Sequence, residues 1–320
     1  MNCKKIMLSK ERKVSITTFL ISDNKELHHN IKRPLVVVCP GGGYHMLSER
    51  EADPIALQFV AAGYHAVVLR YGINEHAVMP GPLKDVADAV CYVRRHCEEW
   101  HVDTDQIYLC GFSAGAHVAA ALGVFWNNAL LLPYYADSPE LIRPNGLILG
   151  YPVIDLASST NRLDIGCQPD MDINDIEYDM IHPNMPREKI FVLDKRERKY
   201  YVNFENAMNA YIFGGEYTKE DENFYSLHNY VSGDTPPTFI WHTSQDNLIL
   251  PANTIKFMAA LEKRHISYEV HMFSDGGHGL ALGNYMTSVY EGQLQSAITP
   301  WKDLAVAWLN RQTGLDKEIG

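Results

Sequence analysis

The stretch QIYLCGFSAGAHVAAALGVFW, residues 106–126, decides the fold. It opens with a short apolar run typical of a buried strand, Ile107–Cys110, and closes with a segment apolar enough for a buried helix, Ala114–Trp126. Between them stands G-x-S-x-G, which in a strand–turn–helix context predicts a nucleophile elbow. On such an elbow Ser113 occupies a strained turn at the carboxyl edge of a sheet, at a helix N-terminus that favours negative charge. The alternative is a tight structural turn without chemistry.

The alternation of strand and helix continues on both sides of this stretch. After an N-terminal strand pair around Val14–Ile21, with a polar turn at Asp23–Lys25, strand-like apolar runs occur at Leu35–Pro40, Tyr64–Arg70, Gly146–Tyr151, Thr238–His242 and Tyr268–Phe273. Helices are expected at Asp53–Ala62, Leu83–Cys97, Asn253–Arg264 and Trp301–Asn310. Repeated β-α units specify a mostly parallel central sheet flanked by helices. We therefore expect a single α/β domain over residues 1–320.

One segment, residues 156–212, breaks the rhythm. It is acidic at first, then basic over Arg187–Lys199, and then rich in aromatic residues, which favours packing over disorder. Within it, Ile190–Leu193 and Tyr200–Phe204 are expected to pair as a hairpin across the charged turn Asp194–Lys199. We interpret the segment as an insertion after a sheet strand that forms a cap or lid. The alternative is an irregular surface excursion.

The charge and composition exclude several classes of partner. The formal net charge of −11 opposes binding to nucleic acid and to anionic membrane surfaces. The longest apolar runs are too short for a transmembrane helix, and the basic start of the chain has no apolar segment behind it. The six cysteines have no C-x-x-C pair and no regular spacing. These features predict a cytoplasmic protein with reduced cysteines.

A second glycine-rich loop, PGGGY (40–44), follows the first buried strand. Together with the N–H of Ala114, the amides of Gly42 and Gly43 are expected to form an oxyanion hole, with the N–H of Tyr44 as an alternative to one of them. A plain glycine turn is the alternative for the whole loop, and a phosphate loop is disfavoured because no G-K-[ST] follows. The side chains expected to line the substrate site are Tyr44 and His45.

Two further loops supply a base and an acid. His278 lies among glycines in DGGHG (275–279), just past the last strand, where a loop residue can reach a serine from another strand. Asp246 directly follows another strand, and its carboxylate is expected to accept the His278 Nδ1–H and to stabilise the imidazolium. Asp155 also follows a strand and is the rival acid. We favour Asp246, with a turn or helix-cap role as the structural alternative.

In combination, these motifs resemble a known family. PGGGY, GFSAGAH (111–117), PPTFIWHTSQD (236–246) and DGGHG look like the acetyl-esterase branch of the α/β-hydrolases, which is related to hormone-sensitive lipase and includes bacterial acetylxylan and feruloyl-type esterases. The resemblance covers about residues 14–155 and 212–310, and it includes the chain order Ser…Asp…His. It implies an α/β-hydrolase fold with the triad Ser113, Asp246 and His278 and the oxyanion hole Gly42, Gly43 and Ala114. The chain departs from the pattern at Pro40, where many relatives have histidine, and in the insertion.

The expected activity is therefore hydrolysis of short-chain carboxylic esters through an acyl-enzyme, with acetyl esters on oligosaccharides as the favoured small-molecule substrates. No cofactor is implied, and no zinc-type His/Cys spacing predicts a metal. A homo-oligomer is compatible with the sequence. The alternatives are an arylformamidase or a small peptidase with the same triad, and a catalytically silent hydrolase fold that serves as a binding module.

Overall fold

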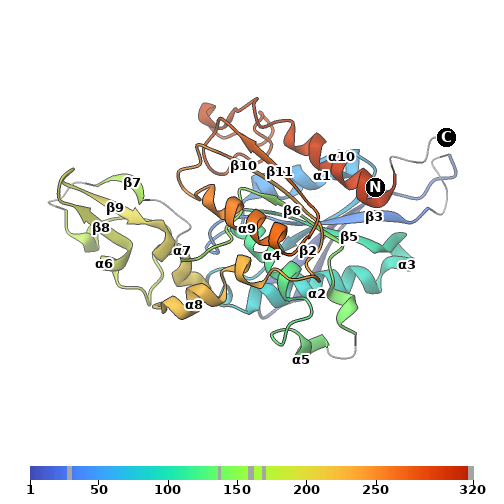
Figure 1. The fold of residues 1–320 in the computed structure, drawn as a ribbon, viewed down its shortest axis with the longest axis horizontal. Helices are drawn as coiled ribbons and strands as arrows, with labels where there is room; N and C mark the ends of the chain where they lie inside the picture. Colours follow the sequence, from blue (N-terminus) through green and yellow to red (C-terminus); the bar gives the residue numbers. More distant parts are fainter. Residues whose placement is uncertain (27–30, 136–137, 158–161, 168–170, 316–320) are drawn as a thin grey trace.

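An eight-stranded sheet forms the centre of the computed structural model, which describes residues 1–26, 31–135, 138–157, 162–167 and 171–315 (Figure 1). Its strands, in spatial order, are β1 (Asn2–Ser9), β2 (Val14–Leu20), β4 (His65–Arg70), β3 (Arg33–Cys39), β5 (Val102–Phe112), β6 (Gly146–Gly150), β10 (Thr238–Thr243) and β11 (Tyr268–Phe273). Strand β2 pairs antiparallel with β1 and β4, and every other neighbouring pair is parallel. The expected mostly parallel α/β sheet is confirmed.

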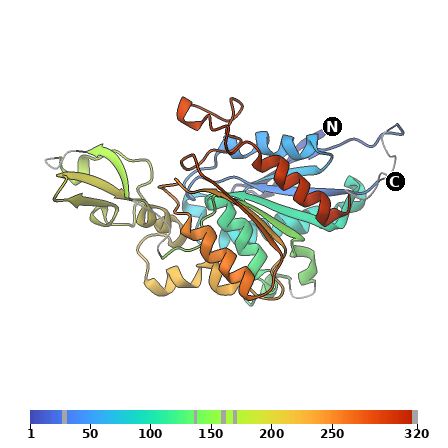
Figure 2. The same ribbon diagram turned by 45° about the horizontal axis from the view of Figure 1, so that its top comes forward.

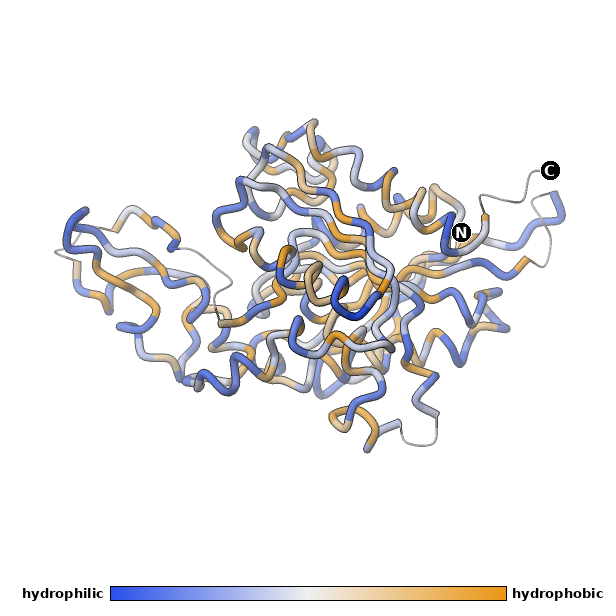
Figure 3. Tube along the Cα trace, viewed as in Figure 1, coloured by the Kyte–Doolittle hydropathy of each residue, from blue (hydrophilic) through white to orange (hydrophobic). Residues whose placement is uncertain are grey.

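Helices cover both faces of this sheet. The principal ones are α1 (Asp53–Ala61), α2 (Gly81–Arg95), α4 (Ala114–Phe125), α9 (Ala252–Lys263) and α10 (Trp301–Thr313). Helices α1 and α10 lie on one face, and α2, α4 and α9 lie on the other (Figures 1 and 2). The buried strand β3 serves both cores, because Val37 packs with the α2 and α4 side while Val36 and Val38 pack with the α1 and α10 side. Hydrophobic residues gather along the central strands (Figure 3).

Shorter helices occupy the connections between these elements. The short α-helices of the main body are α3 (Cys97–Trp100), α5 (Leu132–Tyr135) and α8 (Lys219–Phe224). The 3-10 turns are η1 (Glu49–Glu51), η2 (Asn74–His76), η3 (Pro139–Ile142), η4 (Ile173–Asp175), η5 (Leu227–Tyr230) and η6 (Glu291–Gln293). No helix among the described residues combines the length and the apolar character that crossing a bilayer requires.

The N-terminal strand pair differs from the one that the sequence suggested. Strand β2 is where it was expected, but its hairpin partner precedes it: Asn2 pairs with Leu20 and Ile6 with Ile16 across a turn at residues 10–13. The polar turn at Asp23–Lys25 therefore leads away from the hairpin. Strand β1 escaped prediction because it lies at the sheet edge and is largely exposed, so its apolar positions do not form a buried run.

The segment after β6 forms a small lobe beside the main body (Figure 1). Its elements are β7 (Arg162–Cys167), α6 (Arg187–Ile190), β8 (Phe191–Asp194), β9 (Lys199–Asn203) and α7 (Phe204–Phe213). The predicted hairpin is confirmed, since β8 and β9 pair antiparallel, and β7 adds a third strand on the far side of β9. A separate hydrophobic cluster fills the lobe, with Ile176, Ile190 and Val202 fully buried. The described part of the segment is therefore packed around a small core of its own. Residues 158–161 and 168–170 of the insertion lie outside the described part.

Candidate active site

Ser113 stands on a strained turn between β5 and α4. Its backbone has φ 52° and ψ −121°, a conformation outside the regions that non-glycine residues normally occupy. The flanking glycines are required by close packing: a Cβ at Gly111 would lie 2.4 Å from Gly115 O, and one at Gly115 would lie 2.1 Å from Cys39 O. The predicted strand–elbow–helix geometry is therefore present, and 8% of Ser113 remains exposed to solvent.

His278 and Asp246 complete a continuous relay with Ser113. His278 Nε2 lies 2.8 Å from Ser113 Oγ, and His278 Nδ1 lies 2.7 Å from Asp246 Oδ2. The carboxylate can only accept, so Nδ1 carries the proton and Nε2 accepts the hydroxyl hydrogen of the serine. The three residues come from the ends of β5, β10 and β11, which share the carboxyl edge of the sheet. This is the arrangement that a serine nucleophile with a histidine base needs.

The alternative acid, Asp155, bonds to residues other than His278. Its carboxylate accepts the hydroxyl hydrogen of Ser226 at 3.0 Å and pairs with Lys256. The structure thus brings Asp246 to His278 and places Asp155 in a different buried polar cluster, as the sequence analysis favoured.

A second histidine, His242, also contacts the acid. Its Nε2 lies 3.1 Å from Asp246 Oδ2 and 3.0 Å from Ile249 O, while its Nδ1 lies 2.9 Å from the hydroxyl of Thr254. Burial alone would raise the pKa of the Asp246 carboxyl. The charge of His278 and hydrogen bonds from both histidines outweigh burial and hold that pKa well below its ordinary value. Asp246 therefore stays ionised at neutral pH.

The loop PGGGY crosses in front of Ser113. Gly42 has φ 132° and Gly43 has φ 61°, backbone conformations that favour glycine. A hydrogen bond donated by the backbone N–H of Gly42, Gly43 or Ala114 is absent from the described part of the structure. These three groups, which the sequence proposed as an oxyanion hole, therefore remain candidates to bind an incoming oxygen. By contrast, the N–H of Gly41 is occupied, because it donates to Glu51 Oε2 at 2.9 Å.

A cavity of about 390 Å³ opens over Ser113 and His278. The main body contributes Gly42, Gly43, His45, Met46, Ser48, Arg50, Glu51, Leu248 and Gly279 to its walls. The inserted segment contributes Tyr178, Asp179, Met180 and Phe204. Contact between the two parts is close, since a Cβ at Gly43 would lie 2.6 Å from Met180 Cε. The insertion thus forms part of the wall around the candidate nucleophile.

The two predicted lining residues have different positions. His45 borders the cavity as expected. The expectation for the Tyr44 side chain is wrong, because that side chain is fully buried and its hydroxyl lies 2.7 Å from His117 Nδ1. The reason is local: Tyr44 has φ 64°, and this left-handed backbone turns the side chain toward the core, against Tyr71 and His117.

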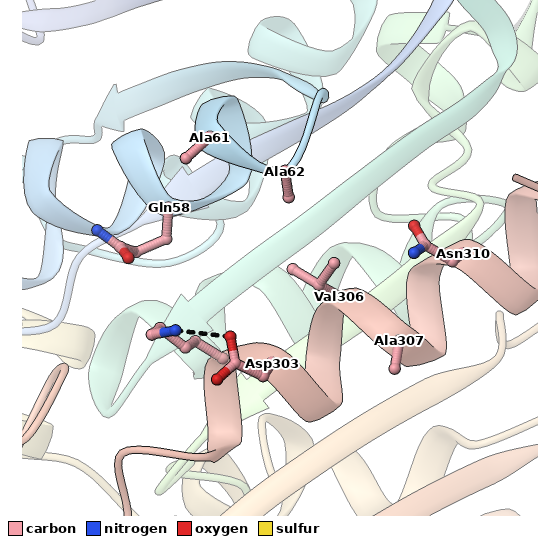
Figure 4. Close-up of a pocket in the computed structure, with 8 residues that line it drawn as sticks. Gln58, Ala61, Ala62, Asp303, Val306, Ala307 and Asn310 are labelled. Atoms are coloured by element: carbon pink, nitrogen blue, oxygen red, sulfur yellow. Dashed lines mark hydrogen bonds and ion pairs between the residues drawn. The ribbon is translucent and has the colours of Figure 1, made fainter. Parts of the chain in front are cut away.

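Another hollow, of about 410 Å³, lies between α1 and α10 (Figure 4). Its walls include Gln58, Val306 and Asn310, and an ion pair between Lys302 and Asp303 stands at one side. The relay residues take no part in its lining. Over the described residues, no group of three or more His, Cys, Asp or Glu side chains is arranged to hold a metal ion.

Sequence reasoning missed two buried groups at this site, His242 and Glu51. The carboxylate of Glu51 accepts the hydroxyl hydrogen of Tyr151, 100 positions away, at 2.6 Å. His242 stands within a strand-like run, where a buried histidine reads as an ordinary core residue. In the sequence, each of these two residues is a polar side chain close to a predicted site loop. That position marks the residue as a possible site residue but does not show which group it bonds.

Comparisons with known proteins identify the family of the chain and several similar proteins. The BD-FAE family model matches residues 24–261. The chain is 29% identical to endo-1,4-beta-xylanase B of Butyrivibrio fibrisolvens over 263 residues, which are 81% of this chain and 34% of that protein. It is 23% identical to an acetylxylan esterase of Xylanibacter ruminicola over 269 residues, 83% of this chain and 44% of that protein. The chain therefore spans less than half the length of these curated relatives.

Among solved structures, the carboxylesterase Cest-2923 of Lactobacillus plantarum WCFS1 aligns with a TM-score of 0.74 and 27% identity over 98% of both chains. The family match covers most of the 320 residues and includes the elbow at Ser113. The chain belongs to the BD-FAE family of α/β-hydrolases.

Proposed function

We propose that the chain is a serine esterase that hydrolyses short-chain carboxylic esters, with acetyl groups on oligosaccharides as its physiological substrate class. The observation that carries the proposal is the unbroken relay from Asp246 through His278 to Ser113, with contacts of 2.7 and 2.8 Å at the floor of a cavity. The names of its relatives, among them an acetylxylan esterase and a carboxylesterase, support the same reaction class.

The reaction follows from the direction of the hydrogen bonds. Ser113 Oγ attacks the ester carbonyl while His278 Nε2 takes its proton, and Asp246 stabilises the imidazolium that forms. The negative charge that develops on the carbonyl oxygen is received by the N–H groups of Gly42, Gly43 and Ala114. His278 then protonates the departing alcohol, and the acyl group remains on Ser113. Water, deprotonated by His278, releases the acid and restores the serine.

The size and walls of the cavity support small substrates. About 390 Å³ is near the lower end of the range for ligand pockets, about 300–1,000 Å³, and must hold both the acyl and the alcohol part. Apolar side chains such as Met180 and Leu248 suit an acetyl or short acyl chain. His45 and Asp179 offer polar atoms to the hydroxyl groups of a sugar. We propose that the insertion, which supplies Met180 and Asp179, acts as a cap over the leaving-group side.

The test is a screen of the purified protein on acyl esters of graded chain length and on acetylated xylo-oligosaccharides. Release of acetate from the oligosaccharides, abolished by Ser113→Ala, is the expected result. Turnover of N-formyl aromatic amides or peptides without any ester hydrolysis would contradict the proposal and favour an arylformamidase or a peptidase. Absence of all turnover, together with absence of covalent labelling at Ser113, would indicate a binding module.

A further inference from the structure

A buried carboxylate, that of Glu51, lies beside the loop PGGGY (40–44), which we call the oxyanion loop. It takes no part in the hydrogen bonds that join Asp246, His278 and Ser113. Glu51 ends the 3-10 turn η1 and is only 3% exposed. Its Oε2 accepts the N–H of Gly41 at 2.9 Å, and its Oε1 accepts the hydroxyl hydrogen of Tyr151 at 2.6 Å. Both partners donate their hydrogen bonds to this side chain. Burying a carboxyl group is unfavourable unless it is hydrogen-bonded, so Glu51 depends on these two donors and is held in place by them.

The first contact of Glu51 fixes the oxyanion loop. Gly41 is the first glycine of PGGGY and packs directly against the nucleophile, since a Cβ at this position would lie 2.6 Å from Phe112 O and 2.9 Å from Ser113 Cβ. A displacement of Gly41 therefore moves the following amides of Gly42 and Gly43 relative to Ser113. Oxyanion donors are effective only when they are held at the correct place before the reaction.

The second contact reaches the histidine loop. Tyr151 follows β6 directly, and its hydroxyl oxygen accepts the N–H of Ala281 at 3.0 Å. Ala281 stands three positions after His278, and its carbonyl accepts the indole N–H of Trp301 at 2.8 Å. The ring of Tyr151 meets the His278 ring edge-on, with 5.0 Å between the ring centres. Tyr151 therefore supports the base both through its ring and through the backbone of its loop.

We propose that Glu51 is a positioning residue that links the oxyanion loop to the loop of the catalytic base. Its carboxylate holds Gly41 on one side and Tyr151 on the other, so that the oxyanion amides and His278 keep a fixed geometry around Ser113. The inference rests on the proposed esterase chemistry of Ser113 and His278.

The experiment compares Glu51→Ala, Glu51→Gln and Tyr151→Phe with the matched control Glu49→Gln. Glu49 belongs to the same turn, but its side chain is 69% exposed and pairs with Arg70 at the surface. Steady-state hydrolysis of p-nitrophenyl acetate gives kcat and KM. Titration with a fluorophosphonate counts active sites, so that kcat is expressed per competent enzyme rather than per folded chain.

We expect Glu51→Ala to lower kcat by about 10²-fold with KM changed less than threefold, the size of effect that misplaced catalytic groups produce. Glu51→Gln should fall between Glu51→Ala and wild type, because its amide oxygen can still accept from Gly41. Adding Tyr151→Phe to Glu51→Ala should lower kcat by less than the product of the two single effects, since the two side chains share one connection. Glu49→Gln should stay within twofold of wild type.

A kcat for Glu51→Ala within twofold of Glu49→Gln would overturn the inference, as would an effect confined to KM. If Glu51→Ala does not fold, Glu51→Gln and Tyr151→Phe are judged by the same kcat and KM criteria, with a loss of about tenfold expected. Ser113→Ala separates the two levels of the argument. Its retained activity would refute the esterase chemistry itself, whereas an inactive Ser113→Ala beside a normal Glu51→Ala would refute only the positioning role.

Discussion

Replacing Asp246 by Asn should remove most of the turnover and leave the fold in place. In the structure, Asp246 Oδ1 accepts the backbone N–H groups of Leu248 and Ile249, each at 3.0 Å, whereas Oδ2 faces His278 and His242. An asparagine retains an oxygen for the two backbone donors, and this places its NH2 group against His278 Nδ1. The imidazole must then carry its proton on Nε2, where it presents a donor to the serine instead of an acceptor.

The Asp246→Asn change should reduce turnover much more than it reduces stability. In a serine–histidine–aspartate triad, the wrong tautomer costs about 10⁴ in turnover, and we expect a loss of about 10³–10⁴, or about 4–5.5 kcal/mol of barrier. The free energy of unfolding should decrease by less than this. His242 gives up its bond to the carboxylate but keeps the Ile249 carbonyl at 3.0 Å, and a hydrogen bond to a charged group contributes about 1.5–3 kcal/mol to stability. Activity should therefore fall much further than the folded fraction.

The assay measures kcat on p-nitrophenyl acetate at equal folded fraction, which circular dichroism establishes for each variant. Asp155→Asn is the matched control, because Asp155 is as buried as Asp246 but bonds Ser226 and Lys256. It should cost less than about tenfold in turnover, a barrier change under about 1.4 kcal/mol. A crippled Asp155→Asn beside a nearly normal Asp246→Asn would refute the assignment of the acid.

Three further predictions concern substrate and pH. Catalytic efficiency should decrease from acetate or butyrate esters to octanoate, because the cavity is small, and a higher efficiency on the long chains would contradict this account. Since the pKa of Asp246 lies well below its ordinary value, this carboxyl stays ionised on the acid side of neutrality; kcat/KM should decrease with one ionisation as the pH falls, and a flat profile to about pH 4 would exclude a histidine base. Joining Leu163 to Val202, which are paired across β7 and β9, by an Asn-Gly turn removes residues 164–201 and with them Tyr178, Asp179 and Met180 of the cavity wall; alcohol selectivity should change more than turnover of p-nitrophenyl acetate, and unchanged selectivity across sugar and aryl esters would assign the lobe another purpose.

The sequence predicted the fold and the relay because both depend on local patterns. A strand, a glycine-rich turn and a helix in succession define the elbow at Ser113 without any knowledge of distant residues. The same logic places His278 and Asp246, since loops at the carboxyl ends of parallel strands meet at one edge of the sheet. The choice between Asp246 and Asp155 rested on position alone, and the hydrogen bonds in the structure favour the former.

Other features depend on tertiary contacts and were not predictable. The inward orientation of Tyr44 follows from a left-handed φ at a residue that usually avoids it. The partner of Glu51 is 100 residues away, and nothing in the surrounding sequence points to it. Strand β7 has only three alternating apolar residues, Leu163, Ile165 and Cys167, which are half-buried against the lobe cluster, and this short pattern does not show that the strand pairs with β9 across a bulged register.

The most direct test of the central claim is peptide mass spectrometry after reaction with a fluorophosphonate. The account predicts one phosphonyl group per chain, attached to Ser113, and labelling that is strongly slowed by His278→Ala because the hydroxyl then lacks its base. Ser113→Ala should neither be labelled nor hydrolyse p-nitrophenyl acetate. Modification of a different residue, or ester hydrolysis retained by Ser113→Ala, would contradict the assignment of Ser113 as the nucleophile.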